Sequence, residues 1–504
     1  MEEPPLNLGF REYIDAVEHQ AKPLVIPLCA ELPLPPLSPP ALFSHLSKGT
    51  GFLLESMEGS EKIARYSYIG PDPDLIVSIG RTVHLEGREP FTSIAMNPEG
   101  KHAIEQVRSI LQRFNYVNMR APRFFGGMVG YFSYDLVHSL YGRMLTIGKL
   151  ITDTPLAQFM LAKDCIVLDH VAQKMLIFCS PLLLYDSDLE EEYERSRERI
   201  ARLAHTITNL DGSGEKEAGP SLEERTIHHG SENMTKQEFC EAVERVKEHI
   251  NAGDIFQAVI SRRIDLDLDI DPFAVYRMLR KINPSPYMYY LGFGNLNVIG
   301  ASPEMLVRVE QRKVTTVPIA GTRPRGRTPD EDTQLAKALL ADEKERAEHT
   351  MLVDLARNDV GRVSKFGSVH VRDFMAIEQF SHVQHIVSTV TGTLRDDLDG
   401  YDAFTSCFPA GTVSGAPKVR AMQIIDGLEP ERRGLYAGAV GYIGFDRNLE
   451  FAIAIRTIIA RKGKASIQVG AGIVADSIPE NEFLETENKA RAMVQALEMA
   501  GGSR

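Results

Sequence analysis

The sequence predicts an α+β fold built from two segments, each with its own strands and helices. Strand-like apolar runs and helical stretches mix along the 504 residues without the strict strand–helix–strand rhythm of a doubly wound sheet. Apolar residues make up 43% of the chain and charged residues 25%, as in ordinary globular proteins. A chain of this length can bury the cores of two or more domains.

The N-terminal segment, residues 1–205, is expected to hold several short strands. The predicted elements are strands at residues 24–28, 75–79, 165–168 and 175–178, a short helix at residues 41–47 and a charged helix at residues 188–204. Residues 32–40, which read LPLPPLSPP, predict a stiff extended connector.

A polar stretch separates this segment from the rest of the chain. Residues 206–233 contain few apolar side chains and many Gly, Ser and Glu residues, which predicts a linker or mobile loop. Thr235 is a plausible N-cap for a helix that runs to about Asn251. Residues 234–500 therefore form a second unit, of mixed strands and helices.

Two acidic stretches of this second unit each predict a helix with paired carboxylates. Asp342 with Glu345, and Ser477 with Glu480, have the spacing of a capping box. Side chains three residues apart project from one helix face. The pairs with this spacing are Glu345 with Glu348 and Glu482 with Glu485.

Both acidic faces continue into apolar positions. Leu352 and Leu355 follow on the first face, and Lys489 and Met493 follow on the second, so the carboxylates should point towards the interior. Two like charges about 4 Å apart at an effective dielectric of about 20 repel by roughly 4 kcal/mol, so inward pairs need a positive partner. Oxygen ligands suit a hard divalent cation, and Mg²⁺ is the leading candidate. The alternative is two solvated acidic faces.

Charge and cysteine usage exclude several classes of protein. The net charge of −13 and the lack of a basic tract argue against nucleic acid or an anionic membrane surface as a partner. The five scattered cysteines form no C-x-x-C pair, which disfavours a zinc site or a disulfide framework. We expect a cytoplasmic protein, since MEEPPLNLGF is unlike a signal peptide and no uncharged apolar run reaches membrane-spanning length.

Several shorter motifs place polar groups where an anionic ligand could bind. Residues 318–326 form a glycine- and proline-containing loop with two arginines, and residues 409–418 resemble a phosphate cradle, although the latter is not a Walker A motif. Glu304 follows a strand-like run, and His385 lies in an apolar segment. Arg456 ends the run FAIAIR, where an inward arginine needs an anionic partner. Taken singly, these motifs are also compatible with surface turns and a core histidine.

Residues 470–475, GAGIVA, match the G-x-G-x-x-A fingerprint of dinucleotide binding and follow the strand-like run SIQV. A nucleotide-dependent oxidoreductase is therefore a second functional class. Against it, a Rossmann unit needs a helix and another parallel strand after the fingerprint, and only one acidic helix and the tail GGSR follow.

The motifs taken in order resemble those of the chorismate-utilising enzymes. The set SPE, PIAGTRPRG, DEKERAEH, DLARNDVGR, VQH, PAGTVSGAPK, GYIG, AIAIRT and GAGIVADSIPENEFLETENKA covers nearly all of residues 234–500. LLES at residues 53–56 and GGMVGYFSYD at residues 126–135 extend the resemblance to the N-terminal segment. Within the family, the chain is most similar to the large subunits (component I) of anthranilate synthases, and the alternative branch is component I of aminodeoxychorismate synthases.

The resemblance implies an anthranilate-synthase-like α/β sandwich, in which large sheets flanked by helices form two interleaved lobes. Residues 1–205 would be the N-terminal lobe, and residues 234–500 would be the chorismate-binding catalytic domain. The implied activity is that of a lyase that converts chorismate and ammonia to anthranilate and pyruvate, the first committed step of tryptophan biosynthesis.

Functional residues of the family carry over to matching positions. The resemblance assigns Mg²⁺, directly or through water, to Glu345, Glu348, Glu482 and Glu485. Glu304 would be the general acid for the C4 hydroxyl of chorismate, His385 would act in the later loss of pyruvate, and Thr322 would belong to the ring pocket. The substrate-binding positions would be Ala320, Gly321, Tyr442, Arg456, Lys489 and the backbone of Gly470, Ala471 and Gly472.

Position 320 separates the branches of the family. Members that add water, and the aminodeoxychorismate enzymes, usually carry lysine there, whereas this chain has Ala320. Alanine cannot act as a base or nucleophile, and it leaves room for ammonia to attack C2. The residue therefore favours the anthranilate synthase branch.

The resemblance also implies feedback inhibition by tryptophan. The motifs LLES and NPSPYM supply Leu54, Glu55, Ser56, Asn283, Pro286, Tyr287 and Met288. Glu55 and Ser56 would meet the polar groups of the ligand. A ligand shared by two lobes can bias their relative position, as allosteric inhibition requires. The alternative is a structural seam with no ligand.

A partner subunit follows from the source of ammonia. No segment of the chain resembles the cysteine-nucleophile elbow of a glutaminase, so ammonia would come from solution or from a separate glutaminase subunit (component II) in a hetero-oligomer such as a heterotetramer. A catalytically silent tryptophan-sensing module is a further alternative, which the full set of carboxylates disfavours.

Overall fold

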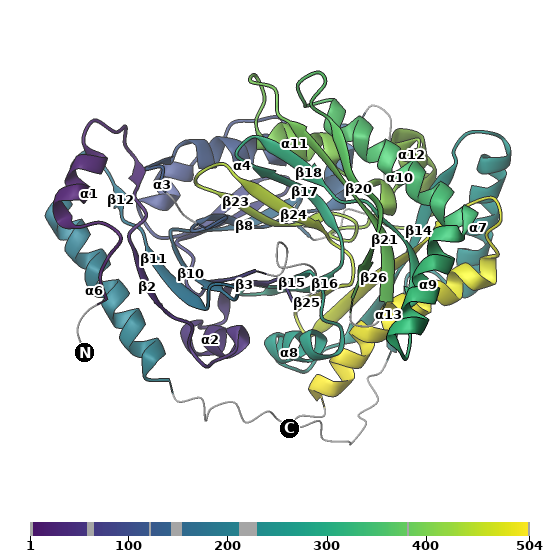
Figure 1. The fold of residues 1–504 in the computed structure, drawn as a ribbon, viewed down its shortest axis with the longest axis horizontal. Helices are drawn as coiled ribbons and strands as arrows, with labels where there is room; N and C mark the ends of the chain where they lie inside the picture. The colour runs from purple at the N-terminus through teal and green to yellow at the C-terminus, as the bar shows by residue number, and fades with distance from the viewer. Residues whose placement is uncertain are drawn as a thin grey trace.

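Two large antiparallel sheets are stacked on one another, with helices on their outer faces (Figure 1). The computed structural model describes residues 4–57, 65–119, 122–142, 154–210, 229–380 and 383–501. In Figure 1, β8, β23 and β24 of one sheet lie above β3, β15 and β16 of the other. The predicted α+β class is confirmed.

The first sheet has 12 strands and the second has 11. The first runs in the order β13 (His229–Glu232), β14 (Gln257–Asp267), β26 (Lys464–Ile473), β25 (Thr457–Arg461), β16 (Leu296–Ser302), β15 (Tyr287–Phe293), β3 (Thr50–Glu55), β4 (Tyr66–Gly70), β10 (Asp164–Asp169), β11 (Lys174–Cys179) and β2 (Cys29–Pro33), with β22 (Gly415–Ala416) paired to β14. The second runs in the order β19 (Ile319–Pro324), β21 (Val383–Thr393), β18 (Lys313–Thr316), β17 (Met305–Glu310), β24 (Leu449–Ile453), β23 (Ala439–Gly444), β8 (Gly127–Phe132), β9 (Ala157–Ala162), β5 (Leu75–Ile79) and β6 (Val83–Gly87), with β20 (His370–Gln379) paired to β21. A small third sheet joins β12 (Leu182–Leu183), β1 (Leu24–Val25) and β7 (Asn115–Tyr116).

The first sheet is buried on both faces, as β15 illustrates. Successive side chains of a strand point to opposite faces. Tyr289 and Leu291 pack into the core shared with the second sheet, whereas Met288 and Tyr290 pack into the core under the helices. The strand is therefore a nearly continuous apolar and aromatic run, as expected for a sheet covered on both sides.

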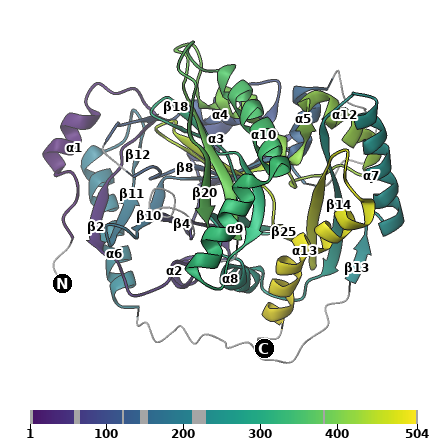
Figure 2. The same ribbon diagram turned by 45° about the vertical axis from the view of Figure 1, so that its right-hand side comes forward.

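Helices cover the outer faces of the sheets (Figures 1 and 2). The core outside the first sheet contains residues of α1 (Phe10–Val17), α2 (Pro39–Leu46), α6 (Leu189–Thr208), α8 (Pro272–Ile282) and α13 (Pro479–Gly501). A smaller core on β14 and β26 contains residues of α7 (Lys236–Asn251) and α12 (Lys418–Leu428). The core around the second sheet contains residues of α3 (Phe91–Ala95), α4 (Ala103–Gln112), α5 (Val137–Leu140) and α11 (Gly400–Cys407). Beside them, α9 (Pro329–Ala341) and α10 (Glu343–Gly361) lie against β19 and β21.

Strands from the N-terminal lobe pair directly with strands from the rest of the chain in both large sheets. In the first sheet, Met288 of β15 lies opposite Glu55 of β3. In the second sheet, Tyr442 of β23 lies opposite Val129 of β8. The two lobes therefore share both sheets, and backbone hydrogen bonds hold the seam between them.

Several predicted elements are confirmed. The strand at residues 75–79 is β5, and the charged helix is α6, which continues past its predicted end. Thr235 caps α7: its hydroxyl accepts a hydrogen bond from Glu238 N at 3.3 Å, and the Glu238 carboxylate accepts one from Thr235 N at 2.8 Å. The strand predicted at residues 24–28 is shorter, because β1 ends at Val25, before the proline at position 27, which has no N–H for a ladder.

The predicted linker at residues 206–233 needs correction at both ends. Its first residues belong to α6, and its last residues include β13, which pairs with β14. Residues 211–228 of the predicted linker lie outside the described residues.

The N-terminus of α13 also differs from the prediction. The helix begins at Pro479, a first helical position where a missing N–H is no loss. The Ser477 hydroxyl accepts a hydrogen bond from Val474 N at 3.1 Å instead of forming the expected capping box with Glu480. Ser477 therefore fixes the turn that precedes the helix.

Residues 470–475 do not form a nucleotide-binding turn. Residues 470–473 are the end of β26, which runs antiparallel to both of its neighbours, β14 and β25. A Rossmann fingerprint requires a parallel strand–helix–strand unit at this point. The oxidoreductase hypothesis is therefore wrong.

The five cysteines are free thiols, and four of them are buried. Across the described parts of the chain, no helix has both the length and the apolar character needed to cross a membrane.

Candidate active site

All of the predicted catalytic and metal-binding residues line one cavity of about 620 Å³, which we call the large cavity. Its walls come from the end of β16, from β19, β21 and β26, and from α10 and α13; the helices come forward in Figure 2. The predicted residues that line it are Glu304, Ala320, Gly321, Thr322, Glu345, Glu348, His385, Arg456, Gly470, Gly472, Glu482, Glu485 and Lys489.

Glu304 is the buried carboxyl group of the large cavity. It follows β16, is 9% exposed, and accepts a hydrogen bond at Oε1 from the Thr412 hydroxyl at 2.9 Å. Burial raises the pKa of Glu304 to about 8, although the hydrogen bond from Thr412 lowers it. Below this pH the group is protonated, so it can donate a proton at neutral pH.

His385 of β21 is oriented by the neighbouring strand β19. Its Nδ1 lies 2.9 Å from Gly321 O and 3.2 Å from Thr322 Oγ1. Because a carbonyl oxygen only accepts, Nδ1 carries the hydrogen, and Nε2 of the neutral ring is a proton acceptor. Burial lowers the pKa of His385, with a further lowering by Arg456, so the neutral form is favoured.

The first pair of carboxylates is placed by the start of α10. Asp342 caps this helix, accepting from Lys344 N at 3.1 Å and from Glu345 N at 3.2 Å. The predicted capping box is only half formed, because the Glu345 carboxylate pairs with Arg323 instead of accepting from Asp342 N. Arg323 of β19 forms ion pairs with both carboxylates: its Nη2 lies 2.9 Å from Asp342 Oδ2, and its Nη1 lies 3.3 Å from Glu345 Oε1. Gly321 has a φ of +65°, and a Cβ there would lie 3.1 Å from Glu345 Oε2, so glycine is required where β19 passes α10.

The carboxylates of α10 and α13 influence one another across the large cavity. Burial raises the pKa of Glu348, and Glu345 and Glu485 raise it further. Burial and Glu485 also raise the pKa of Glu482, although a hydrogen bond from Ser477 lowers it. Mutual repulsion of this kind is relieved when a cation binds.

The four glutamates differ in exposure. Glu345, Glu348 and Glu482 are half-buried, so the alternative of solvated acidic faces does not hold for them. Glu485 is exposed and pairs with Lys489 at 2.6 Å. Among the described residues, no three carboxylate, histidine or cysteine side chains lie close enough together to enclose a metal ion. The donor set, four carboxylates, fits a hard cation whose coordination is completed by water or by an anionic ligand.

Arg456 and Lys489 provide positive charge in the same cavity. Arg456 follows β24 with a φ of +51°, a left-handed conformation fixed by the hydrogen bond from Ala301 N to its carbonyl oxygen at 3.1 Å. Its guanidinium forms no ion pair with any carboxylate in the part of the chain that the structure describes. Burial lowers the pKa of Arg456, which reflects this low-dielectric setting. An enclosed and unpaired guanidinium is a site for an anion.

The tyrosine beside Arg456 is not the predicted one. Tyr436 lines the large cavity, whereas Tyr442 lines a second pocket. Tyr436 precedes β23 and lies next to Gly470, but Tyr442 is inside β23, and its ring packs 5.7 Å from that of Tyr68, between the sheets. The prediction for Tyr442 as a substrate-binding residue is therefore wrong.

Strand β26 turns glycines towards the large cavity. A Cβ at Gly470 would lie 2.6 Å from the Tyr436 hydroxyl oxygen, so a side chain is excluded there. Gly472 points the same way, because side chains alternate along a strand. The Ala471 side chain points to the opposite face and packs with Ala421 in the smaller core. Ala471 can therefore contribute only its backbone, the part for which a role was predicted.

Two further residues of the large cavity were not singled out from the sequence. Thr412 lies in the short 3₁₀-helix η3 (Gly411–Val413), inside the glycine-rich loop that the sequence did indicate. Gln468 of β26 donates to Ser261 Oγ at 2.8 Å and lines the cavity. Nothing in the sequence distinguished this glutamine from an ordinary polar strand residue.

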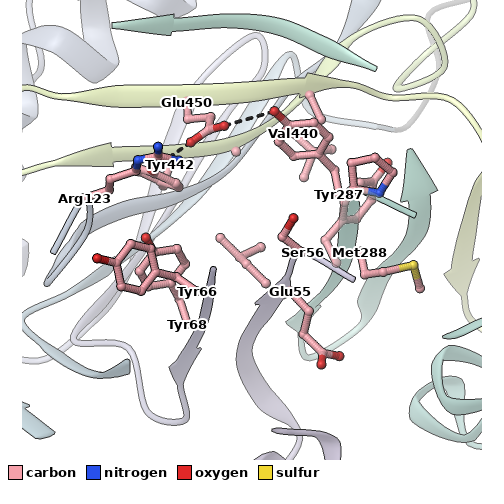
Figure 3. A pocket seen from close by; sticks show the side chains of 15 residues that line it. Glu55, Ser56, Tyr66, Tyr68, Arg123, Tyr287, Met288, Val440, Tyr442 and Glu450 are labelled. Carbon is pink, nitrogen blue, oxygen red and sulfur yellow. Dashed lines mark hydrogen bonds between the residues drawn. The ribbon is translucent and has the colours of Figure 1, made fainter. Parts of the chain in front are cut away.

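The second pocket, which we call the interlobe pocket, lies between the two sheets at the seam of the lobes (Figure 3). It has a volume of about 70 Å³, with walls from β3, β4, β15, β23 and β24. Six of the residues predicted for tryptophan line it, namely Leu54, Glu55, Ser56, Pro286, Tyr287 and Met288. Glu450 accepts hydrogen bonds from the hydroxyls of Tyr287 at 3.0 Å and Tyr442 at 3.1 Å.

The polar groups of the interlobe pocket differ from those expected. The Ser56 hydroxyl is buried, has no hydrogen-bond partner among the described residues, and is directed into the pocket (Figure 3). The Glu55 carboxylate points away (Figure 3), accepting hydrogen bonds from Arg280 Nε at 2.9 Å and from the Tyr276 hydroxyl. This corrects the expectation that Glu55 would meet a ligand, because its oxygens are already paired. Glu450 is the carboxylate that faces the pocket.

Asn283, the seventh residue predicted for this pocket, does not line it. It follows the last residue of α8, and its N–H donates to Leu279 O at 2.9 Å. Asn283 therefore ends the helix that precedes the pocket-lining strand β15.

Comparison with known proteins identifies the family. The model of the family described as chorismate binding enzyme matches residues 52–495. Anthranilate synthase component 1 of Acetivibrio thermocellus is 45% identical over 498 residues, 98% of this chain and 99% of that protein. The crystal structure of anthranilate synthase component I from Streptococcus pneumoniae TIGR4 is similar with a TM-score of 0.71 and 35% identity, over 91% of this chain and 97% of that chain. The chain belongs to the chorismate binding enzyme family.

The fold is shared more widely than this branch. The menaquinone-specific isochorismate synthase of Escherichia coli matches with a TM-score of 0.67 at 19% identity, over 97% of this chain and 98% of that chain. The fold by itself therefore does not select the reaction, and residues of the large cavity must do so.

We expect Glu304 to hold its proton at neutral pH. The infrared carbonyl band of a protonated carboxyl group, measured as the difference between the protein and its Glu304→Gln variant, should fade as the pH rises through about 8. Thr412→Val removes the hydrogen bond that lowers this pKa, so it should move the midpoint to higher pH. A band already absent at neutral pH would contradict the burial argument.

Proposed function

We propose that the protein is the large subunit of an anthranilate synthase, which converts chorismate and ammonia to anthranilate, pyruvate and water. The observation that carries the proposal is the large cavity. It combines a carboxyl group that is protonated at neutral pH, carboxylates suited to a divalent cation, and two cations suited to an anion, in a family of chorismate binding enzymes. The names of the similar proteins support this branch of the family.

Chorismate is a dianion, and the large cavity offers a separate place for each of its carboxylates. Arg456, Lys489, Tyr436 and the backbone of β26 would bind the enolpyruvyl carboxylate. Glu345, Glu348, Glu482 and Glu485 would hold Mg²⁺ directly or through water near the ring carboxylate. When bound, the ion supplies the positive charge that an acidic protein otherwise lacks at this wall.

The first step would be the exchange of a hydroxyl for an amino group. Glu304 donates its proton to the C4 hydroxyl, which leaves as water while ammonia forms a bond to C2 and the two ring double bonds shift between these carbons. The ammonium group formed at C2 then loses one proton, which restores the acid form of Glu304. Burial keeps this proton on Glu304 at neutral pH. General acid catalysis of this kind typically contributes about 10²–10⁴-fold.

The second step would be the loss of the side chain. His385 Nε2 is free to accept the proton at C2 because Nδ1 donates to Gly321 O. The bond from C3 to the side-chain oxygen breaks, the ring becomes aromatic, and the released enolpyruvate gains a proton to become pyruvate. Thr322, which lies 3.2 Å from the same imidazole nitrogen, would help to hold the ring of His385.

Ala320 supports an ammonia-dependent rather than a water-dependent reaction. Its methyl group lines the large cavity from β19, beside Gly321 and Thr322. No basic group stands at this position to activate water, so a neutral nucleophile such as ammonia can approach C2.

We also infer that tryptophan binds in the interlobe pocket as a feedback inhibitor. The pocket supplies the rings of Tyr66, Tyr68 and Tyr442 for an indole. The unpartnered Ser56 hydroxyl and the Glu450 carboxylate would meet its polar groups. This arrangement supports a ligand in preference to an empty seam.

Ammonia would be delivered by a separate glutaminase subunit, component II, in a hetero-oligomer such as a heterotetramer. The component 1 names of the relatives support this partner. Five free thiols are consistent with the predicted reducing cytoplasm.

Anthranilate fluorescence tests the proposal. The chain alone, with chorismate, ammonium and Mg²⁺, should produce anthranilate, lose the activity with a chelator, and recover it with added Mg²⁺. Glu348→Gln should abolish Mg²⁺-dependent chorismate binding measured by calorimetry, because it removes a carboxylate of the cation site. Glu343→Gln is the matched control, since Glu343 is exposed at the start of the same helix and does not line the large cavity. Full activity of Glu348→Gln would remove the carboxylate argument.

The branch assignment depends on position 320. Ala320→Lys should suppress ammonia-dependent anthranilate formation at least tenfold, because a cationic side chain would fill the space proposed for ammonia. Ala320→Leu is the control that separates size from charge. Product analysis by chromatography would show whether a water-derived product replaces anthranilate. Unchanged ammonia-dependent activity in the lysine variant would place position 320 outside the reacting region.

Tryptophan and chorismate should oppose each other. Linkage requires each ligand to weaken the binding of the other by the same factor, typically about 5–150-fold. Titrating each ligand against the other by calorimetry measures both factors. Ser56→Phe should fill the interlobe pocket and relieve inhibition, while kcat without tryptophan stays within about twofold. If calorimetry detects no heat of tryptophan binding to the unmodified protein, the feedback site is ruled out.

A further inference from the structure

A third, smaller cavity lies behind Glu304, and we call it the rear cavity. Its volume is about 40 Å³. Glu304, Leu352 and Thr412 line both the rear cavity and the large cavity, so Glu304 stands between the two. Most of the other walls are apolar, from α10, α11 and the start of β17.

The rear cavity also contains a carboxylate that none of the steps above uses. Asp359, in the last turn of α10, lines it and is 5% exposed. Its Oδ2 accepts a hydrogen bond from Lys418 Nζ at 2.9 Å, and the same nitrogen donates to Cys407 O at 3.3 Å. Its Oδ1 is buried and has no hydrogen-bond partner among the residues that the structure describes. A buried carboxylate oxygen without a partner indicates that something else donates to it.

Water fits this position. One water needs roughly 10–15 Å³ of such space and two or more polar partners, and apolar cavities of similar size stay dry. The rear cavity, at about 40 Å³, exceeds this requirement. It offers the carboxyl groups of Glu304 and Asp359 and the hydroxyl of Thr412 as polar partners.

We propose that water in the rear cavity joins Glu304 to Asp359, and that the Asp359–Lys418 ion pair is a positioning pair that keeps a proton on Glu304 between turnovers. The proposal rests on the function proposed above. The Glu304 O–H donates to the water, the water donates to Asp359 Oδ1, and Lys418 donates to Asp359 Oδ2. A hydrogen bond donated by the neutral carboxyl group favours its protonated form.

Besides accepting a hydrogen bond through the water, the Asp359–Lys418 pair favours protonated Glu304 because its two charges cancel. A lone ammonium near Glu304 would favour the carboxylate form, whereas the Asp359 carboxylate cancels the charge of Lys418. Burial raises the pKa of Asp359, while Lys418 and Arg362 lower it. The groups that face this pair are Arg362 of the same helix, Cys407 of α11 and Tyr141 after α5.

From the substrate side, Glu304 faces Lys344, His385, Tyr436, Arg456, Lys489 and the four glutamates of the large cavity. These groups do not line the rear cavity. Changes at Asp359 and Lys418 therefore alter the rear surroundings of Glu304 while its front surroundings stay the same.

The fall of kcat at alkaline pH, which we call the alkaline limb of the pH profile, tests whether the Asp359–Lys418 pair influences the protonation of Glu304. With saturating chorismate and ammonium, kcat should fall as the pH rises through the pKa of Glu304. Asp359→Asn leaves Lys418 unpaired, so the limb should move to lower pH by about one unit, an approximately tenfold change in protonation. Asp359→Asn combined with Lys418→Met removes both charges and should recover at least half of that shift. The KM for chorismate should stay within about threefold, because neither residue lines the large cavity.

Asp164→Asn is the matched control. Asp164 is 9% exposed and pairs with Lys163 at 3.2 Å and Arg199 at 2.8 Å, but it lines neither cavity. The alkaline limb of the kcat profile should stay at the same pH in the Asp164→Asn variant. An unmoved limb in Asp359→Asn, or an equal shift in Asp164→Asn, would overturn the proposal.

Two further measurements keep the proposal testable if Asp359→Asn does not fold. A high-resolution crystal structure of the unmodified protein should show ordered water within hydrogen-bond distance of Asp359 Oδ1, and a dry cavity would overturn the proposal. Ala356→Leu should displace that water while leaving the ion pair in place, and it should also change the pH of the limb, because Glu304 loses both a hydrogen-bond partner and its solvation.

Failure of this inference can be told apart from failure of the proposed function. If the unmodified protein makes no anthranilate, the proposed function fails. The infrared titration of Glu304 in the same variants would still report its pKa. An equal midpoint in the unmodified protein, Asp359→Asn and Ala356→Leu would then overturn the positioning role.

Discussion

The pairing of N-terminal with C-terminal strands is the constraint on which the rest of this structure depends. In each large sheet, one antiparallel ladder joins the lobes, between β3 and β15 and between β8 and β23. A slip of one residue would turn every side chain of a strand to the opposite face. The interlobe pocket and the core between the sheets therefore exist only in this register.

One hairpin of the second sheet serves both sites. Tyr442 and Glu450, on β23 and β24, line the interlobe pocket, while Tyr436 before the hairpin and Arg456 after it line the large cavity. The same hairpin also fixes the backbone of Glu304, whose carbonyl oxygen accepts from Ile453 N at 3.0 Å. A ligand in the interlobe pocket would thus contact the element that positions residues of the large cavity, which is the physical link that the proposed feedback inhibition needs.

Burial, rather than net charge, organises the electrostatics of the large cavity. The protein carries a net charge of −13, yet the proposed substrate is a dianion. Three local arrangements overcome this mismatch. Desolvation favours the neutral form of Glu304, half-buried Arg456 has no ion-paired carboxylate among the described residues, and the acidic faces of α10 and α13 would bind the proposed cation. Positive and negative side chains therefore line the same cavity, and Lys489 lies beside the carboxylates of α13, paired with Glu485 at 2.6 Å.

The sequence by itself determined many of the local elements, and it predicted a set of site residues that the structure gathers around the large cavity. Capping at Asp342 and Thr235, the strand at residues 75–79 and the spacing of the glutamates all depend on side chains a few positions apart, so short-range physics sufficed. Ordered motifs then brought Glu304, His385 and Arg456 into one predicted site, and the structure places them around one cavity. The family assignment follows from the same motifs and agrees with the comparisons.

Only the tertiary structure decided how these residues are paired and oriented. The family resemblance assigned Tyr442 to the substrate, but strand β23 carries this residue between the sheets. Tyr436, which the sequence did not single out, precedes the strand and lines the large cavity. Glu55 belongs to the predicted motif, yet Arg280 and Tyr276, more than 200 residues away, occupy its carboxylate. The unpartnered oxygen of Asp359 behind Glu304 has no sequence signature at all. Such contacts join residues far apart in the chain, and their geometry follows from packing, which local sequence patterns do not encode.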